Sequence, residues 1–456
     1  MKFVGRTREL DILNQRFKNG KKEFGIIYGS EGIGKSSLLR EFLKDKPHIF
    51  FQAKKTSAFG QLRALTDEAR KNIPLPDDYN YSNWQTALEN IIKYMGGKGL
   101  VIAIDEYTNI SNQDSNFCSM LANVIKNATS EIYFLLTSSD IPQVRNALSS
   151  EAPLFELVSF NIELKKLDFR DAIQLIDEIS NDEKVRYLTL TATYPYYLKA
   201  IDSSKSFEEN VKNLFYNEYS PFFNLGEHLL SSITSTQDVY HAILYAIANF
   251  KKSNKAIADY INEDDPKVSK YIVTLLNYGV VEKREPFMGN KKSTFYRIVD
   301  PMVKFWYKFI YNNQEAIKLD SETLFNDELE NINNYVNNSF DFVARLYLED
   351  LNINGELTEY FPELQLYRPE GAAHNNLIKI DGVAEKNGVL LIMDAKPTNQ
   401  KFDLTMLKDV IKRAQVFNQE FKRKYYIFSK QGFIGMIKEL ESEDLHFITP
   451  NELFIK

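Results

Sequence analysis

The 456-residue sequence has little of several residues that would mark a function. Its single cysteine, Cys118, excludes a disulfide framework and a cysteine-based zinc site. Its five histidines are scattered without the spacing of metal ligands. It has no apolar run of roughly 18 residues, so we expect no transmembrane helix. Gly5 and Arg6 come too early for a signal peptide. We therefore expect an intracellular, cytoplasmic protein of several globular domains.

The sequence also lacks a large excess of either charge. The 56 basic and 62 acidic residues leave a net charge of −6. This balance excludes a globally basic nucleic-acid coat and a polybasic membrane binder, but it does not exclude a local basic patch. Residues 251–300 hold ten Lys or Arg and seven Asp or Glu, so this segment carries +3. The net charge of residues 251–300 is therefore opposite in sign to that of the whole chain.

Strand-like and helical patterns alternate in the first part of the chain. Short continuous apolar runs occur at 24–28, 48–52, 100–104 and 132–136. Helical patterns such as 36–44 and 84–95 lie between them, which predicts an α/β fold with a parallel sheet buried on both faces. Later segments read as mostly helical, then as helices with a β-ribbon, then as a second α/β segment. The domain ranges we predict are 1–165, 166–223, 224–322 and 323–456.

A phosphate-binding loop is the clearest motif. Residues 29–36 fit G-x-x-x-x-G-K-[ST], with a strand before them and an amphipathic helix after them. Glycines let backbone N–H groups surround phosphates, and the helix N-terminus favours anions. We expect Lys35 to bridge the β- and γ-phosphates and to act in catalysis, and Ser36 to ligate Mg²⁺. The loop residues predicted to contact the nucleotide are Gly29, Ser30, Glu31, Gly32, Ile33, Gly34, Lys35, Ser36 and Ser37.

Two acids complete this predicted site. The apolar strand 100–104 ends in Asp105 and Glu106, at the sheet edge where ligands bind in open α/β folds. We expect Asp105 to hold the Mg²⁺ shell and Glu106 to orient or deprotonate the attacking water. The next strand ends in Thr137-Ser138-Ser139. A hydroxyl there, for which we take Ser138, is a candidate contact for that water or the γ-phosphate, with helix capping as the alternative. No Asn-Lys-x-Asp signal for guanine occurs, so we expect ATP.

Two further segments resemble the archaeal-type ATPases, a family within the AAA+ superfamily. These are Phe-Val-Gly-Arg-Thr-Arg-Glu-Leu at 3–10 and Tyr-Pro-Tyr-Tyr-Leu at 194–198. The resemblance implies that Val4 and Arg6 lie near the adenine and that Pro195 belongs to a nucleotide-facing helical lid.

The same resemblance exposes one departure. Leu157 stands where related sequences usually carry an arginine. An arginine finger contributes several orders of magnitude in rate, so its absence predicts slow turnover or an arginine supplied from elsewhere. Arg145 and Arg170 are the nearby candidates.

The middle of the chain predicts three helices and a β-ribbon. Ser253 is a cap signal for the second helix. Asp265 and Pro266 mark the start of the third, and Gly279 marks its end. The strands expected to form the ribbon are 280–284 and 294–298.

This order is the pattern of a winged helix-turn-helix. Residues 296–301 and 305–309 resemble the end of that module in the archaeal-type ATPases, and we expect the aromatic residues of 305–309 to be core. Basic side chains of the third helix and wing suit the phosphates of double-stranded DNA, whereas many winged helices pack against protein instead. Both readings stay open. The basic residues concerned are Lys267, Lys270, Lys283, Arg284, Lys291, Lys292 and Arg297.

A hairpin is predicted near the C-terminus. Asn387-Gly388 is a strong two-residue turn signal between the apolar segments 377–385 and 389–396. In the register that this turn sets, Asp381 faces Asp394, and Lys396 shares the face of Asp394. Opposed carboxylates repel each other, and a divalent cation between them would remove the conflict.

The spacing Asp-x₁₂-Asp-x-Lys is also that of PD-(D/E)XK nucleases, to which the C-terminal domain of archaeal-type ATPases is similar. The resemblance implies a restriction-endonuclease-like α/β domain. In it, Asp381 and Asp394 bind Mg²⁺, and Lys396 positions the attacking water or stabilises charge. Asp341, in a helix before the hairpin, is the candidate for the remaining acid, and Gln415 is a weaker candidate.

Together these observations predict an ATP-hydrolysing, Mg²⁺-dependent protein of the AAA+ type. Its fold class is α/β: a P-loop NTPase parallel sheet with a helical lid, a winged helix-turn-helix and the nuclease-like domain. Nucleotide state would position the last two on DNA. The alternative is an ATP-dependent regulatory switch with a non-catalytic C-terminal domain. The expected cofactors are ATP and Mg²⁺. The expected partners exclude membranes, and self-association stays open.

Overall fold

The computed structural model describes residues 3–75, 83–94, 99–128, 131–288, 294–361, 364–367, 379–397 and 399–455. The chain divides into two units, Met1–Leu167 and Asp168–Lys456. A few predictions lie outside the described residues: the helix end at Met95, the wing lysines Lys291 and Lys292, and the hairpin residues Leu377 and Ile378. No described helix is long and apolar enough to cross a membrane.

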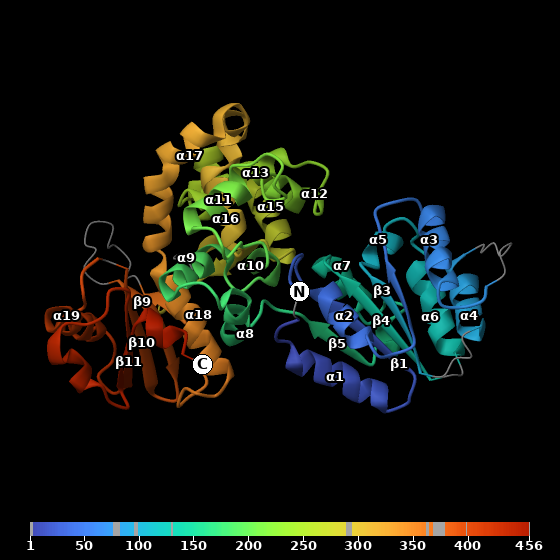
Figure 1. The fold of residues 1–456 in the computed structure, drawn as a ribbon, viewed down its shortest axis with the longest axis horizontal. Helices are drawn as coiled ribbons and strands as arrows, with labels where there is room; N and C mark the ends of the chain where they lie inside the picture. The colour runs from blue at the N-terminus through green and yellow to red at the C-terminus, as the bar shows by residue number, and fades with distance from the viewer. Residues whose placement is uncertain are drawn as a thin grey trace. The chain divides into compact units, whose positions relative to one another are not determined.

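A five-stranded sheet forms the centre of the first unit (Figure 1), and each of its strand pairs is parallel. The four predicted strands are confirmed to within two residues, and a fifth, β5, was not predicted. Every residue of β1, β3 and β4 is buried, as expected for a sheet covered on both faces. In the order β2-β3-β4-β1-β5, the strands are His48–Gln52, Leu100–Asp105, Ile132–Ser138, Glu23–Tyr28 and Phe160–Glu163.

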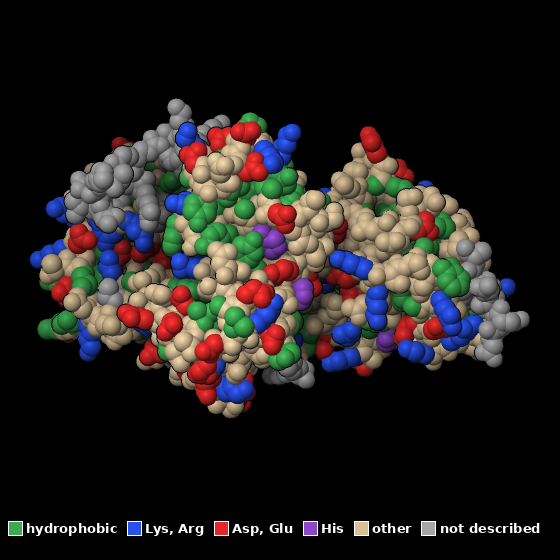
Figure 2. Space-filling model, turned by 90° about the horizontal axis from the view of Figure 1, so that it is seen from above, with side chains coloured by type: hydrophobic (Ala, Val, Ile, Leu, Met, Phe, Trp, Pro, Cys, Tyr) green, Lys and Arg blue, Asp and Glu red, His purple; other side chains and the backbone are tan. Residues whose placement is uncertain are grey.

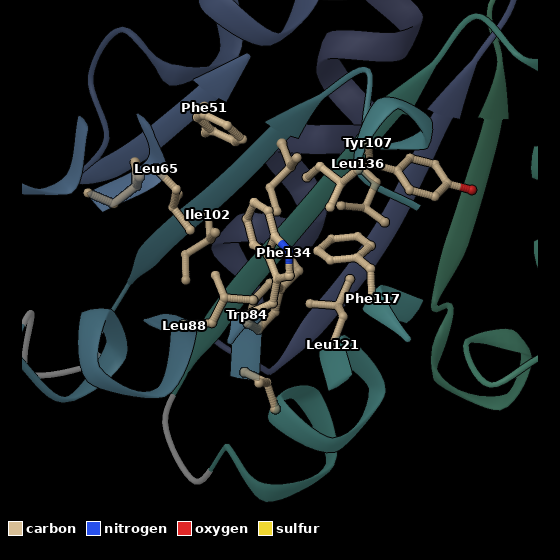
Figure 3. Packing of buried hydrophobic residues seen from close by; sticks show 14 of the residues in the cluster. Phe51, Leu65, Trp84, Leu88, Ile102, Tyr107, Phe117, Leu121, Phe134 and Leu136 are labelled. Atoms are coloured by element: carbon tan, nitrogen blue, oxygen red, sulfur yellow. The ribbon is translucent and has the colours of Figure 1, made fainter. Parts of the chain in front are cut away.

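Helices cover this sheet and fix its strands. Figure 3 shows Trp84 of α4 and Phe117 of α6 beside Phe134 of β4. The Trp84 and Phe117 rings meet edge to face with centroids 5.2 Å apart, and all three side chains are buried. This packing holds the strands whose carboxyl ends carry the predicted site. The helices are α1 Thr7–Lys18, α2 Lys35–Leu43, α3 Ala58–Arg70, α4 Trp84–Tyr94, α5 Thr108–Ser111, α6 Phe117–Asn127 and α7 Ile141–Ala147.

The second unit begins with helices and a small ribbon. The ribbon strands β6, Val281–Arg284, and β7, Phe295–Ile298, pair antiparallel. The predicted helix signals are confirmed: Ser253 accepts a hydrogen bond from the Ala256 N–H, and Gly279 follows the third helix with φ +70°. The helices are α8 Phe169–Ile173, α9 Asn181–Thr191, α10 Pro195–Leu198, α11 Phe207–Phe215, α12 Leu225–Ser231, α13 Asp238–Ala248, α14 Asn254–Ile261 and α15 Asp265–Asn277.

An aromatic helix, α16 (Pro301–Phe309), lies at the core of these helices. Its predicted core role is confirmed, because Phe305, Trp306 and Tyr307 are fully buried. The Trp306 indole N–H donates to the Phe223 carbonyl at 2.8 Å. A Cβ on Gly226 would lie 2.2 Å from the Trp306 ring, so α12 can approach the indole only with glycine there.

A second five-stranded sheet closes the chain. Its order is β12-β11-β10-β9-β8. The predicted hairpin register is confirmed from Val389↔Lys386 to Met393↔Gly382, with Asn387 and Gly388 both at positive φ as a tight hairpin turn requires. The strands are β8 Gln365–Tyr367, β9 Ile380–Lys386, β10 Val389–Lys396, β11 Lys422–Ser429 and β12 Leu445–Ile448; the helices are α17 Gln314–Asn337, α18 Phe340–Ile353, α19 Leu404–Ala414 and α20 Pro450–Leu453.

Charge is mixed over the surface. On the face seen in Figure 2, acidic and basic side chains are interspersed over both units. Attraction for a polyanion therefore has to come from local groups of basic side chains, as the net charge of −6 already required.

One buried acid ties α10 to α16 within the second unit. The Tyr197 hydroxyl donates to Asp300, whose other oxygen accepts the N–H groups of Met302 and Val303. Burial raises the pKa of Asp300 to about 6, and these three hydrogen bonds oppose that rise.

The raised pKa predicts how stability depends on pH. The folded chain holds this proton more tightly than the unfolded chain, so the contribution of Asp300 to stability is fully present below about pH 4 and is lost as pH rises through about 6. We expect Asp300→Asn to remove this pH-dependent loss, which is on the order of 3 kcal/mol, while keeping the helix cap. Urea unfolding of both proteins across this pH range measures the difference. If the free energy of unfolding changes with pH in the same way in both proteins, Asp300 is not the source of the pH dependence.

Candidate functional site

The phosphate-binding loop joins β1 to α2 in a backbone conformation that needs glycine. Gly29, Gly32 and Gly34 have φ of +155°, +75° and +101°. A Cβ on Gly29 would lie 2.4 Å from the Leu164 carbonyl oxygen. Gly34 caps α2 without a side-chain hydrogen bond, so the first N–H groups of the helix are left for a bound anion.

Lys35 lies at the centre of this loop. Its side chain is only 4% exposed. Its ammonium donates to the carbonyls of Gly29 at 3.0 Å and Ser30 at 3.1 Å, and to the Ser139 hydroxyl at 2.7 Å. It also lies 3.4 Å from Oε1 of Glu106. The cation is thus held between the loop and the end of the sheet, as a phosphate-binding lysine requires.

A hydroxyl and a carboxylate meet beside the lysine. Ser36 donates to Oδ2 of Asp105 at 2.7 Å, and Asp105 is fully buried. The Thr137 hydroxyl donates to the other oxygen, Oδ1. Oxygen donors of this kind fit Mg²⁺, which is held by one or two protein oxygens together with phosphate. Thr137 belongs to the strand end named for a candidate hydroxyl, but its contact with Asp105 was not predicted, because only the fold brings β4 beside β3.

The Glu106 side chain lies beside Lys35 and Ser139. Its φ of +54° is uncommon for a residue with a side chain, and such strain gathers at functional sites. Its N–H donates to Thr137. Its carboxylate accepts the Ser139 N–H at 2.8 Å and the Ser139 hydroxyl at 2.6 Å. Glu106 and Lys35 therefore share one hydroxyl, that of Ser139.

The prediction for Ser138 needs correction. Its hydroxyl is fully buried, lies 2.8 Å from that of Thr108 and accepts the Asp140 N–H at 2.9 Å. Ser138 is the last residue of β4, and successive side chains of a strand point to opposite faces. The structure therefore brings Ser139, not Ser138, to Lys35 and Glu106.

Arg6 contacts the backbone of the phosphate-binding loop and of the segment after β5. Its guanidinium donates to the Ile33 carbonyl at 3.1 Å and to the Lys165 carbonyl, and it pairs with Glu9 at 3.3 Å. These contacts join α1, the loop and the segment after β5. Val4 is partly buried. Contact of Val4 and Arg6 with the adenine stays a prediction, as does the nucleotide contact of Pro195, which begins α10 in the second unit.

The candidate arginines differ in availability. Leu157 packs on the core of the first unit. Arg145 on α7 is exposed and close enough to Tyr28, the residue before the loop, to lower its pKa against the raising effects of burial and Glu163. Arg170 pairs with Glu356 at 2.7 Å and Asp350 at 3.5 Å, both in its own unit. Arg145 therefore lies near the loop in the first unit, whereas Arg170 is held in ion pairs of the second.

A second cluster surrounds the C-terminal hairpin. Asp381 Oδ1 lies 2.5 Å from the Lys379 ammonium, and Oδ2 accepts the Ala395 N–H at 3.1 Å. Asp394 lies 3.0 Å from the Arg413 guanidinium and 3.1 Å from the Lys396 ammonium. The cations Lys379, Lys396 and Arg413 thus offset the repulsion between Asp381 and Asp394, for which the sequence analysis suggested a divalent ion.

The helical acid lies near this cluster. Burial raises the pKa of Asp341 on α18, and the charge of Asp381 raises it further, so the two carboxylates lie close enough to interact. Gln415 is exposed after the end of α19, and Arg413 contacts Asp394 instead. Within the described ranges, no group of three or more Asp, Glu, His or Cys could hold a metal ion.

The loop, its buried lysine and the acids at the end of β3 define a P-loop nucleotide hydrolase. More narrowly, residues 3–201 match the model of a family of ATPase domains found predominantly in Archaea. Residues 306–405 match a family described as archaeal and bacterial proteins of unknown function.

One similar protein covers nearly the whole chain, and two others cover parts of it. An uncharacterised protein of Methanocaldococcus jannaschii is 22% identical over 454 residues, 97% of each chain. An uncharacterised ATP-binding protein of the same organism is 36% identical over 44 residues, 10% of this chain and 75% of that one. The Walker-type ATPase PABY2304 of Pyrococcus abyssi has a similar fold, with a TM-score of 0.52 and 16% identity over 67% of this chain and 96% of that one.

Proposed function

We propose that the chain hydrolyses ATP with Mg²⁺ and uses nucleotide state to position its second unit on DNA. The observation that carries the first part is the convergence of Lys35, Glu106 and the Ser36–Asp105 pair at one end of the sheet. Lys35 would bind the phosphates, and Ser36 with Asp105 would hold Mg²⁺, which supplies charge stabilisation. Glu106 would orient the attacking water and accept its proton.

Support for DNA binding comes from the order of α13, α14 and α15 followed by the β6–β7 ribbon, which is that of a winged helix-turn-helix. Lys270 on α15 and Lys283 on β6 are exposed. Arg284 and Arg297 both pair with Glu282, so their charge is partly neutralised. The exposed lysines are therefore the phosphate contacts that we expect.

Fluorescence anisotropy with a labelled DNA duplex tests this part. Binding should weaken as salt rises, and Lys270→Ala should reduce the slope of log affinity against log salt by about one. Lys255→Ala, an exposed lysine on α14, provides a control of equal charge. Absence of salt-dependent binding would favour the alternative, a nucleotide-driven regulatory switch.

Nuclease activity is a second candidate function. It is supported by Asp341, Asp381, Asp394 and Lys396 lying in one cluster. The Asp394 carboxylate is buried, and its Oδ2 lies 3.1 Å from the Lys396 ammonium, so the acid and the lysine of the predicted motif lie side by side. The cation pairing of both strand acids favours the non-catalytic alternative.

Asp394→Ala separates these alternatives. We expect it to abolish Mg²⁺-dependent DNA cleavage, by about a hundredfold or more, and to spare ATP hydrolysis, because a carboxylate that holds the metal cannot be replaced by a methyl group. Asp409→Ala removes the other acid bound to Arg413, at 2.9 Å, and should leave cleavage intact. Cleavage that persists in Asp394→Ala would place the activity elsewhere.

A further inference from the structure

A cationic pocket lies within the second unit, apart from the phosphate-binding loop. It has a volume of about 260 Å³. Its walls come from the segment after α13, the β6–β7 ribbon, α16, α18 and the residues around β8 and β9. Glu285 and Asp341 are the acids of its lining. The basic residues of the lining are Lys252, Arg284, Arg297, Lys304, Arg345 and Lys379.

Protein acids pair with three of the basic side chains of the lining. Arg284 and Arg297 contact Glu282, and Lys379 contacts Asp381 at 2.5 Å. Arg345 donates to two backbone carbonyls, those of Asp381 at 2.7 Å and Leu364, which carry no net charge. A pocket built in this way favours an anion, since an uncompensated cation in a poorly solvated site is costly.

Lys304 is the strongest indication. Its ammonium makes no hydrogen bond or ion pair with any residue of the described chain, and it lies 5.2 Å from the centre of the Tyr335 ring. Burial and the charges of Lys252, Lys308 and Arg297 together lower the pKa of Lys304 to about 8, against the opposing effect of Asp341. An anion beside this ammonium would relieve both effects.

The mouth of the pocket carries aromatic faces. Phe250 is 63% exposed, and the Lys252 and Lys308 ammonium groups lie 5.9 and 5.3 Å from its ring centre. Phe295 lies beside Lys252 as well, at 5.4 Å. Exposed rings next to cations are the combination on which nucleic-acid bases stack. A volume just below the usual range for small-molecule sites suits a phosphate with its sugar, with the base outside.

We propose that this pocket binds the terminal phosphate of a nucleotide, with Lys304 as its central contact. Both a free mononucleotide and the phosphorylated end of a DNA strand present this chemistry. The proposal goes beyond ATP hydrolysis at the loop, and it does not require that the winged module or the hairpin acids act on DNA.

Calorimetric titration of the full chain carrying Lys35→Ala, which disables the loop, tests the proposal. The probes are deoxyadenosine 5′-monophosphate and a short DNA strand with and without a 5′-phosphate. Adding Lys304→Met should weaken binding of the phosphorylated probes by about tenfold or more, because one charge-assisted contact is lost. The methionine keeps the apolar stem against Tyr335. Adding Lys255→Met, which removes an exposed lysine outside the pocket, should change affinity less than about twofold.

The outcomes are distinguishable. Stronger binding of the phosphorylated strand than of the mononucleotide identifies a strand end as the ligand, and equal binding identifies the free nucleotide. Equal affinity for both strands, absent binding of all probes, or equal losses in the two methionine variants would overturn the proposal. Thermal unfolding with and without the mononucleotide separates lost binding from lost folding: only the Lys304→Met protein should show no shift while unfolding cooperatively.

Discussion

Lys35→Ala is expected to abolish ATP binding. The ammonium is buried and reaches the loop carbonyls, Ser139 and Glu106 at once, so no other side chain can take its place. Loss of two charge-assisted hydrogen bonds to phosphate, at about 1.5–3 kcal/mol each, corresponds to roughly a hundredfold to ten-thousandfold in affinity. Calorimetry with ATP and Mg²⁺ measures this change.

A control on the same helix makes the test specific. Lys44→Ala removes the charge just after α2, where Lys44 is exposed and pairs with Glu41 at 2.7 Å. Surface pairs of this kind contribute little, so ATP affinity should stay within about twofold. Unchanged affinity in Lys35→Ala would contradict the assignment of the loop.

The parts of the fold that could be predicted have strong local signals. Four strands of the first sheet follow from continuous apolar runs, and three of these strands, β1, β3 and β4, are buried on both faces. The hairpin register follows from Asn387-Gly388, because a two-residue turn leaves only one pairing. β5 was missed because, of its four residues, only Phe160 is buried, and a short edge strand has no continuous apolar run.

The parts of the site that were missed depend on tertiary contacts. Ser138 and Ser139 are neighbours of the same type, and only the direction of each side chain at the end of β4 separates them. The argument for a cation between Asp381 and Asp394 considered two strands alone. Arg413 comes from α19 and Lys379 precedes β9, and neither could be placed from the hairpin pattern. The cationic pocket was missed for the same reason, since its lining comes from distant segments.

Glu106→Gln is expected to separate binding from hydrolysis. Glutamine has the same shape and meets the same backbone strain at φ +54°, so the loop should keep its conformation. It cannot accept a proton from water, and loss of a general base costs about a hundredfold to ten-thousandfold in rate. ATP affinity should stay within about fivefold, because the lost contact with Lys35 at 3.4 Å frees that ammonium for phosphate. Calorimetry and phosphate release measure the two quantities.

The matched control for this variant is Glu163→Gln. Glu163 ends β5, next to β1 at the same edge of the sheet, and pairs with Lys165 at 2.6 Å. It makes the same change of charge without contact to Ser139 or Lys35, so kcat should stay within about twofold. If the negative charge of Glu106 mattered only through long-range electrostatics, Glu106→Gln and Glu163→Gln would lower kcat equally. Normal kcat in Glu106→Gln would remove Glu106 as the base and leave water activation to another group near Ser139.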